Sequence, residues 1–220
     1  MTVVIKSKRK TRSNSSEGGL RERAKLDKQL KILEAAEALF REKGFEATTT
    51  REVSERAGIA AGTLFLYVKD KVELLLWVYA QKIRGTIAEI ERRFVAIQKS
   101  TQRLIKEDWE KEAIGFFQPF FKLYAKDPAT AREFVKQQMF ASGEGSARER
   151  NDFLALIVGW LERGKSAGIV SASTHSPTIA TTLFAVYFLH LGGWLMKGGD
   201  STPAIKALQS HITTVLRGVY

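Results

Sequence analysis

The 220-residue sequence contains no cysteine, which excludes disulfide bonds and thiolate metal ligands and is compatible with a reducing cytoplasm. It has only three histidines, at positions 175, 190 and 211, without metal-ligand spacing or an adjacent carboxylate. The Gly-x-Ser-x-Gly elbow, a phosphate-binding loop ending in Lys-Ser/Thr and the His-Glu-x-x-His motif are also missing. We therefore expect no catalytic residue, no metal site and no cofactor.

Acidic residues are scarce relative to basic ones, since 24 Asp+Glu stand against 35 Lys+Arg and give a formal net charge of +11. Residues 1–25 alone hold eight basic and two acidic side chains. A basic N-terminus suits a polyanion such as DNA or an anionic membrane face, and a solvated tail is the plainer alternative.

The N-terminus has no apolar stretch of the length that a signal peptide needs. Residues 176–196 carry no Lys, Arg, Asp or Glu and approach the length of a membrane span. They also contain Pro177, His190 and two glycines, and a buried helix at a dimer interface explains this composition equally well. We expect a cytoplasmic protein that makes no membrane contact.

Sustained alternation of period two is missing, so the sequence predicts an all-α fold without a sheet. Leu26, Leu30, Leu33 and Phe40 share one face of a helix that Gly44 is expected to end. Further helices are expected at about 100–125 with an interruption at Pro119, from Pro128, and at about 148–167, 177–197 and 203–218.

Two short helices are predicted between these longer ones. Thr49 and Glu52 have the spacing of a capping box, which opens a helix that ends at Gly58. The second short helix runs over about 61–68, and Asp70 caps the long helix that follows.

This pair is typical of a helix-turn-helix, in which the flanking helices support two helices too short to be stable alone and the second enters the DNA major groove. Small residues at the start of this second helix let its backbone approach the groove, and Thr63 can contact a thymine methyl or hydrogen-bond a base. Arg51 can grip a phosphate or read guanine. Leu64, Phe65 and Val68 are expected in the core. The residues expected to contact DNA are Thr49, Thr50, Arg51, Ala60, Ala61, Gly62, Thr63, Leu66, Tyr67 and Lys71.

The segment from Ile32 to Leu75, ILEAAEALFREKGFEATTTREVSERAGIAAGTLFLYVKDKVELL, resembles the N-terminal signature of the tetracycline-repressor (TetR) family. The resemblance covers about a fifth of the chain and implies an all-helical dimer with an N-terminal DNA reader and a divergent C-terminal ligand domain. Phe65 departs from the family pattern, which commonly has a phosphate-binding tyrosine there, and Tyr67 is expected to supply the phenol instead. The landmarks are Ala35-Ala36, Leu39-Phe40, Gly44-Phe45, Thr49-Thr50, Arg51, Ala57-Gly58-Ile59, Gly62-Thr63-Leu64, Lys71 and Glu73-Leu74.

Three regions follow from this interpretation. Residues 1–20 are expected to be a disordered basic arm, residues 21–84 the helix-turn-helix DNA-binding domain with its connecting helix, and residues 85–220 the ligand-binding and dimerisation domain. The arm is expected to add affinity without sequence preference by reaching the DNA backbone or the minor groove. Its basic side chains are Lys6, Lys8, Arg9, Lys10 and Arg12.

Residues 85–220 are rich in aromatic side chains, most of which must be ordinary core. The resemblance implies a ligand cavity among them, and the near-absence of charge in its expected lining favours a small apolar or aromatic effector. The residues expected to line it are Trp109, Phe117, Phe121, Phe134, Gln138, Met139, Tyr187 and His190.

The helices near 148–167 and 177–197 are expected to form a homodimer by pairing with their symmetry mates in a four-helix bundle. The sequence thus predicts a sequence-specific transcription regulator, and the resemblance to the TetR family favours a repressor that leaves a pseudo-palindromic double-stranded operator when its effector binds. An activator of the same fold, or a non-specific architectural protein that binds DNA or a membrane surface, are the alternatives.

Overall fold

The computed structural model describes residues 14–98, 105–140 and 147–220. All regular secondary structure within these ranges is helical, which confirms the expected all-α fold. The ten helices there are α1 (Asn14–Ala47), α2 (Thr50–Arg56), α3 (Ala61–Leu64), α4 (Lys71–Gln98), α5 (Lys106–Gly115), α6 (Gln118–Ala125), α7 (Pro128–Phe140), α8 (Ala147–Ser166), α9 (Ser176–Lys197) and α10 (Thr202–Arg217).

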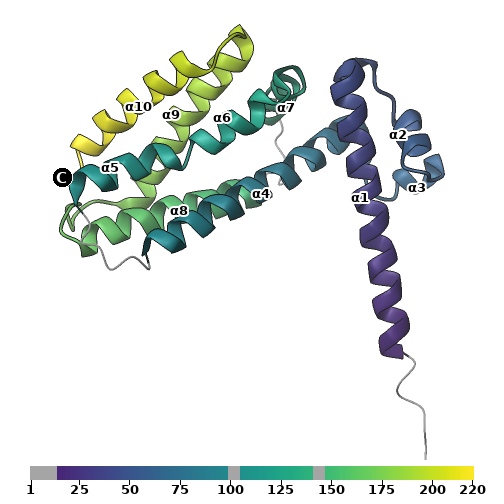
Figure 1. The fold of residues 1–220 in the computed structure, drawn as a ribbon, viewed down its shortest axis with the longest axis horizontal. Helices are drawn as coiled ribbons and strands as arrows, with labels where there is room; N and C mark the ends of the chain where they lie inside the picture. The colour runs from purple at the N-terminus through teal and green to yellow at the C-terminus, as the bar shows by residue number, and fades with distance from the viewer. Residues whose placement is uncertain (1–13, 99–104, 141–146) are drawn as a thin grey trace, which may run out of the picture.

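Two groups of helices are joined by α4. Figure 1 shows α1, α2 and α3 together at one end of the molecule and α5 to α10 at the other. Helix α4 contacts α1 in the first group and α6, α7 and α8 in the second. The boundary predicted at residue 84 falls inside this continuous helix, so both groups share one rigid element, and the boundary itself stays a prediction.

The first helix begins earlier than the sequence predicts. Residues 14–20 of the expected arm belong to α1, while the basic residues expected to bind DNA there lie outside the described residues. Leu26, Leu30, Leu33 and Phe40 lie in one helix as predicted, but the shared face is covered only in its C-terminal half, because Leu26 and Leu30 are 51% and 58% exposed whereas Phe40 is buried. Figure 1 shows the reason, since the N-terminal half of α1 extends past α2 and α3. Gly44 ends the regular part of the helix, as predicted, with a φ of 84° that favours glycine.

Local sequence signals mark the starts of five of the ten described helices. Thr49 and Glu52 form the predicted capping box at α2. All four prolines of the sequence lie in the first turns of α6, α7, α9 and α10, where a missing N–H costs no helical hydrogen bond. The predicted interruption at Pro119 is confirmed, because α5 ends at Gly115 and α6 begins at Gln118.

Helix α3 is shorter than the predicted span of 61–68. It ends at Leu64, and the chain continues in tight turns in which Leu66 N–H donates to Thr63 O at 3.2 Å and Tyr67 N–H to Leu64 O at 2.9 Å. These bonds join residues three apart rather than four, so the last turn is wound more tightly than an α-helix.

Helix α9 is long and apolar enough to cross a membrane by length and composition alone, although only 33% of its most apolar window is buried within the protomer. One such helix is weak evidence for a membrane span, because core helices of soluble proteins pass the same test.

Two indoles stack in the core of the C-terminal group. The rings of Trp109 on α5 and Trp160 on α8 lie 3.9 Å apart at 6°, and both side chains are fully buried. Gly164, one turn after Trp160, gives the stack its room. A Cβ there would lie 2.7 Å from Val170 Cγ2 and 2.9 Å from the Trp109 ring.

The Gly164→Ala variant is therefore expected to lose about 1–3 kcal/mol of unfolding free energy through overpacking. Gly159→Ala on the same helix is the matched control, because its Cβ would meet only Phe94, at 3.9 Å. Chemical denaturation of both variants tests this. Equal stability of the two would show that the indole stack is not tightly packed against position 164.

Candidate DNA-binding surface and effector pocket

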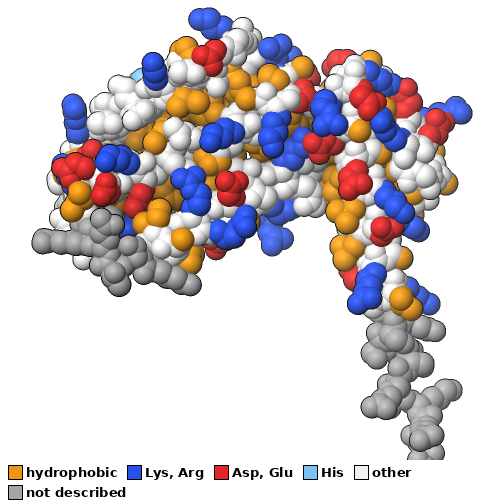
Figure 2. All heavy atoms as spheres, in the orientation of Figure 1, with side chains coloured by type: hydrophobic (Ala, Val, Ile, Leu, Met, Phe, Trp, Pro, Cys, Tyr) orange, Lys and Arg blue, Asp and Glu red, His pale blue; other side chains and the backbone are white. Residues whose placement is uncertain are grey.

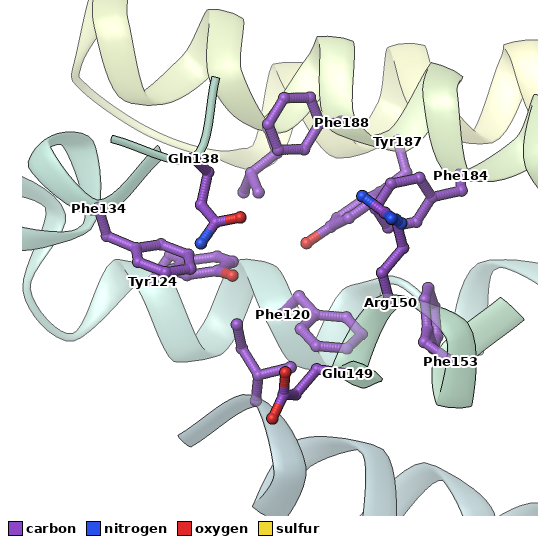
Figure 3. A pocket seen from close by; sticks show the side chains of 12 residues that line it. Phe120, Tyr124, Phe134, Gln138, Glu149, Arg150, Phe153, Phe184, Tyr187 and Phe188 are labelled. Atoms are coloured by element: carbon purple, nitrogen blue, oxygen red, sulfur yellow. The ribbon is translucent and has the colours of Figure 1, made fainter. Parts of the chain in front are cut away.

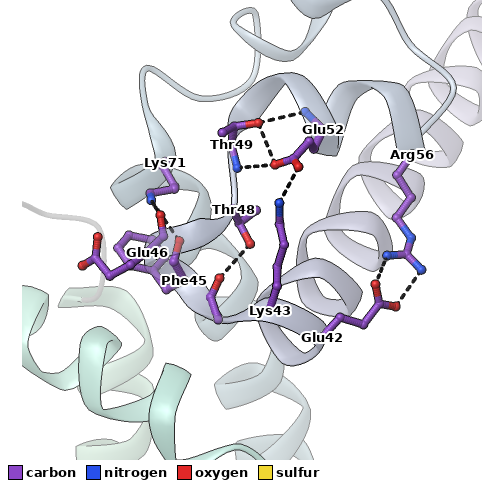
Figure 4. Close-up of polar contacts among 10 residues, drawn as sticks. Glu42, Lys43, Phe45, Glu46, Thr48, Thr49, Glu52, Arg56 and Lys71 are labelled. Carbon is purple, nitrogen blue, oxygen red and sulfur yellow. Dashed lines mark hydrogen bonds and ion pairs between the residues drawn. The ribbon is translucent and has the colours of Figure 1, made fainter.

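A polar network holds α2 against α1 (Figure 4). Thr49 N–H donates to Glu52 Oε2 at 2.9 Å, Glu52 N–H donates to Thr49 Oγ1 at 3.2 Å, and Lys43 from α1 binds Glu52 Oε1. The Lys43 hydrogen bond, followed by those from Thr49, lowers the pKa of Glu52 to about 2. The stabilisation is present above the usual carboxyl pKa and is lost only as pH falls through about 2.

The end of α1 is bound directly to the start of α4. Lys71 Nζ donates to the backbone oxygens of Phe45 and Glu46, both at 2.9 Å, and lies 4.5 Å from the centroid of the Phe45 ring. Thr48 Oγ1 donates to Gly44 O at 2.8 Å. These bonds satisfy carbonyl groups that have no partner within the helix. Lys71, predicted only as a DNA contact, thus also joins two helices.

Replacing Lys71 by methionine keeps the aliphatic stem and removes the two donors. We expect a loss of about 1.5–3 kcal/mol in unfolding free energy without DNA, the range for hydrogen bonds to charged groups. Lys69→Met, at an exposed neighbouring position, is the control and should leave stability unchanged. If Lys71→Met weakens only DNA binding, the structural role is refuted.

The start of α3 forms an exposed surface of small side chains. Ala60, Ala61 and Gly62 are exposed, and a Cβ at Gly62 would meet nothing within 4 Å. Leu66 is 83% exposed, and Thr63 is half-buried beside it. A backbone with this little side-chain cover can approach base edges closely, as a recognition helix must.

Phe65 corrects one expectation. Leu64 and Val68 are buried as predicted, whereas Phe65 is 53% exposed on the same surface as Leu66. Because α3 ends at Leu64, the tighter turn carries positions 65 and 66 outward. Phe65 therefore joins the apolar part of the candidate DNA-binding surface, which sequence periodicity assigned to the core.

The remaining residues expected to bind DNA lie around this surface in different environments. Arg51 is exposed and pairs with Glu55 at 3.0 Å, and Thr49 is exposed at the start of α2. Thr50 is half-buried, and its backbone oxygen accepts a hydrogen bond from Ser54 Oγ. The half-buried Tyr67 ring stacks on Trp77 of α4 with centroids 6.1 Å apart, which fixes the direction of its phenol.

An aromatic pocket of about 220 Å³ lies in the C-terminal group (Figure 3). Helices α4, α6, α7, α8 and α9 all contribute to its wall. Burial raises the pKa of the Tyr124 and Tyr187 phenols above its usual value, so both stay neutral at physiological pH. The lining residues are Ile83, Phe120, Tyr124, Phe134, Gln138, Glu149, Arg150, Phe153, Phe184, Tyr187, Phe188 and Leu191.

Three of the eight residues expected to line a cavity lie in this wall, namely Phe134, Gln138 and Tyr187. The Met139 side chain lies outside the described residues. The others are placed elsewhere. Trp109, Phe117 and Phe121 are core residues packed on aromatic neighbours, and His190 pairs with His211 across α9 and α10, with ring nitrogens 3.2 Å apart.

Sequence reasoning missed two charged residues of the pocket. Glu149 and Arg150 stand in the first turn of α8, and charged residues at a helix start are normally solvated. Glu149 is nevertheless buried, and it pairs with Arg84 of α4, which is 65 positions away. No signal in the sequence reveals a pairing over that separation.

A capped helix-turn-helix with an exposed second helix, joined to a separate helical group around an apolar pocket, has the architecture of a helix-turn-helix transcription regulator. Comparison with known proteins agrees. Residues 32–78 match the family model described as bacterial regulatory proteins, tetR family. The HTH-type transcriptional repressor KstR of Rhodococcus jostii (strain RHA1) is 36% identical over 189 residues, covering 76% of this chain and 89% of that protein. The chain belongs to the tetR family, a family of transcription regulators and not of enzymes.

Other relatives extend the similarity over most of the chain. KstR of Mycobacterium tuberculosis is 25% identical over 201 residues, or 91% of this chain and 86% of that protein. Two solved structures share the fold. FadR from Bacillus subtilis in complex with stearoyl-CoA has a TM-score of 0.65 at 17% identity, covering 87% of this chain and all of that one. FadR from Thermus thermophilus in complex with lauroyl-CoA has a TM-score of 0.65 at 21% identity, covering 83% and 92%.

Proposed function

We propose that this chain is a homodimeric repressor that holds a pseudo-palindromic operator and releases it when a small apolar ligand enters the pocket of the C-terminal group. One observation carries the proposal. Ile83, in the wall of the pocket, belongs to α4. This helix begins beside the DNA reader, the group of helices α1 to α3, and Lys71 binds its start to the end of α1. A ligand that shifts α4 must therefore change the position of the reader.

The chemistry of the pocket supports an apolar effector. Aromatic and aliphatic side chains make up most of its wall, with few polar groups between them. The two FadR structures hold acyl-CoA thioesters, and the named repressor relatives are KstR proteins. The cavity volume of about 220 Å³ is below that of most ligand sites, which favours the shorter of the two acyl chains. Lauroyl-CoA is therefore tested before stearoyl-CoA.

The exposed side of α9 supports dimerisation. Ala185, Leu189, Gly193 and Met196 are all exposed and follow one another at helical spacing, so they form one stripe. Leu189 is 70% exposed in the protomer. Figure 2 shows hydrophobic side chains gathered over the upper part of the C-terminal group, with charged side chains of both signs around them. A symmetric contact through this stripe would bury it, and its small residues permit close approach of two helices.

The Leu189→Asp variant is accordingly expected to weaken self-association at least tenfold while its helix content stays unchanged, because the mutated side chain is exposed in the folded protomer. Sedimentation velocity over a concentration series measures this. Gln209→Asp on α10, also at an exposed position, is the control. An unchanged dimer in Leu189→Asp would place the interface elsewhere.

The first test of the function is selection of bound sequences from a random duplex library at about 150 mM salt, which partly suppresses non-specific phosphate binding. Recovery of a pseudo-palindrome supports a dimeric sequence-specific regulator.

Lauroyl-CoA is then added to the complex, and loss of fluorescence anisotropy of the labelled operator reports release. Recovery of no enriched sequence favours the architectural alternative. An operator that raises reporter expression in the presence of the protein favours an activator.

A further inference from the structure

One residue of the pocket wall has a buried carboxylate oxygen without a hydrogen-bond partner among the described residues. Glu149 is only 4% exposed and lines the pocket, and its Oε1 binds Arg84 of α4. Its second oxygen, Oε2, has no partner there. Figure 3 shows the Glu149 side chain beside Phe120, on the side of the pocket where α4 runs.

An oxygen in this position is costly to leave unpaired. A buried acceptor without a donor loses its hydration and gains nothing in return, and the penalty is larger for a charged group. Glu149 lies in the first turn of α8, and the Arg84 guanidinium binds its Oε1, so Oε2 is the carboxylate oxygen left to accept a hydrogen bond. A pocket that keeps such a group has a built-in preference for ligands that donate a hydrogen bond.

We infer that Glu149 is a specificity-determining residue of the effector site, whose Oε2 accepts a hydrogen bond from a hydroxyl or amide N–H next to the apolar part of the ligand. The effector class is then an apolar chain or ring system bearing one hydrogen-bond donor. This deepens the proposed function and rests on it, since it concerns the same pocket. Glu149 acts on binding and makes no contact with DNA.

Two probes with the same alkyl chain distinguish the effect of a hydrogen-bond donor on affinity from the effect of apolar burial. These are 1-decanol and its methyl ether, which cannot donate. Titration calorimetry on the unmodified protein is expected to give binding of 1-decanol about tenfold tighter or more, as a hydrogen bond to a charged acceptor allows. This comparison uses the unmodified protein, so it does not depend on whether a variant folds.

In Glu149→Gln, Arg84 should stay hydrogen-bonded to the side-chain amide oxygen, because a guanidinium only donates hydrogen bonds. The amide nitrogen then faces the pocket, and both probes can accept from it. The tenfold preference is expected to fall within twofold. Glu133→Gln on α7 also removes one negative charge, but its carboxylate binds Lys136 outside the pocket wall, so this control should keep the wild-type preference.

Equal affinity of the wild-type protein for both probes would overturn the role of Glu149, while operator release by either probe would still support the proposed function. Binding of neither probe would overturn both the role of Glu149 and the apolar effector pocket, and operator selection would remain a separate test of DNA binding. A preference that persists in Glu149→Gln would also overturn the assignment, because the selecting group would then lie elsewhere.

Discussion

The Phe121→Asp variant is expected to lose the cooperative thermal unfolding of the C-terminal helical group and to expose its apolar surface to hydrophobic dyes. Phe121 is 1% exposed, with ring centroids 6.0 Å from Tyr187 and 5.7 Å from Trp194. An aspartate there would be a buried charge without a partner in place of a large apolar ring. The penalty is about 4–5 kcal/mol or more, which approaches the whole stability of many domains.

Ala125→Asp is the matched control, because it introduces the same side chain at an exposed position of the same helix, α6. Its melting temperature should stay within a few degrees of the wild-type value. Circular dichroism melts of the two variants decide the matter. If Phe121→Asp melts like the control, Phe121 is not a core residue and the packing of α6 on α9 is different from that described.

The Gly62→Glu variant is expected to bind the selected operator about a hundredfold more weakly while keeping its fold. A side chain at Gly62 meets nothing within 4 Å in the free protein, so the helix tolerates it. In the complex it would stand between the start of α3 and the groove, where it adds bulk and a negative charge facing phosphates. The effect is expected to be this large because the glutamate would both keep the start of α3 away from the groove and repel the DNA phosphates.

Gly85→Glu is the control for this variant. Gly85 is also an exposed helical glycine with open space around it, but it lies on α4 beyond the reader. Fluorescence anisotropy with the labelled operator should give it wild-type affinity. Equal affinities for the two variants would mean that α3 does not enter the groove.

Features set by neighbouring residues were predictable from the sequence. The capping box at Thr49, the positive φ at Gly44 and the helix starts at the four prolines all depend on a few consecutive positions, and the structure contains each of them. The helix-turn-helix was found for the same reason, since its turn and caps lie within one short segment. Periodicity placed Leu26 and Leu30 on the same helix face as Phe40, but it does not tell whether anything covers that face, and these two leucines are exposed.

The pocket was much harder to predict, because it is defined by contacts between helices distant in the sequence. Phe134 and Phe121 look alike in the sequence, yet one lines the pocket and the other lies in the core. Glu149 shows the converse difficulty, because only its pairing with Arg84 explains how a charged residue can be buried. Choosing aromatic residues on composition alone therefore found part of the wall and none of its charged members.

The length of α4 sets how far a small movement in the pocket is carried. If the end at Gln98 stays fixed, Ile83 is 15 residues away and Lys71 is 27, or about 22 Å and about 40 Å at the rise of an α-helix. A sideways displacement of about 1 Å at Ile83 then becomes nearly 2 Å at Lys71, by the ratio of these two distances. A shift of that size takes a hydrogen bond of about 2.9 Å to a phosphate out of range. On the proposed mechanism, a ligand that displaces α4 by less than the width of an atom would be enough to release the operator, and tight packing of the pocket around the ligand would be needed to transmit that displacement.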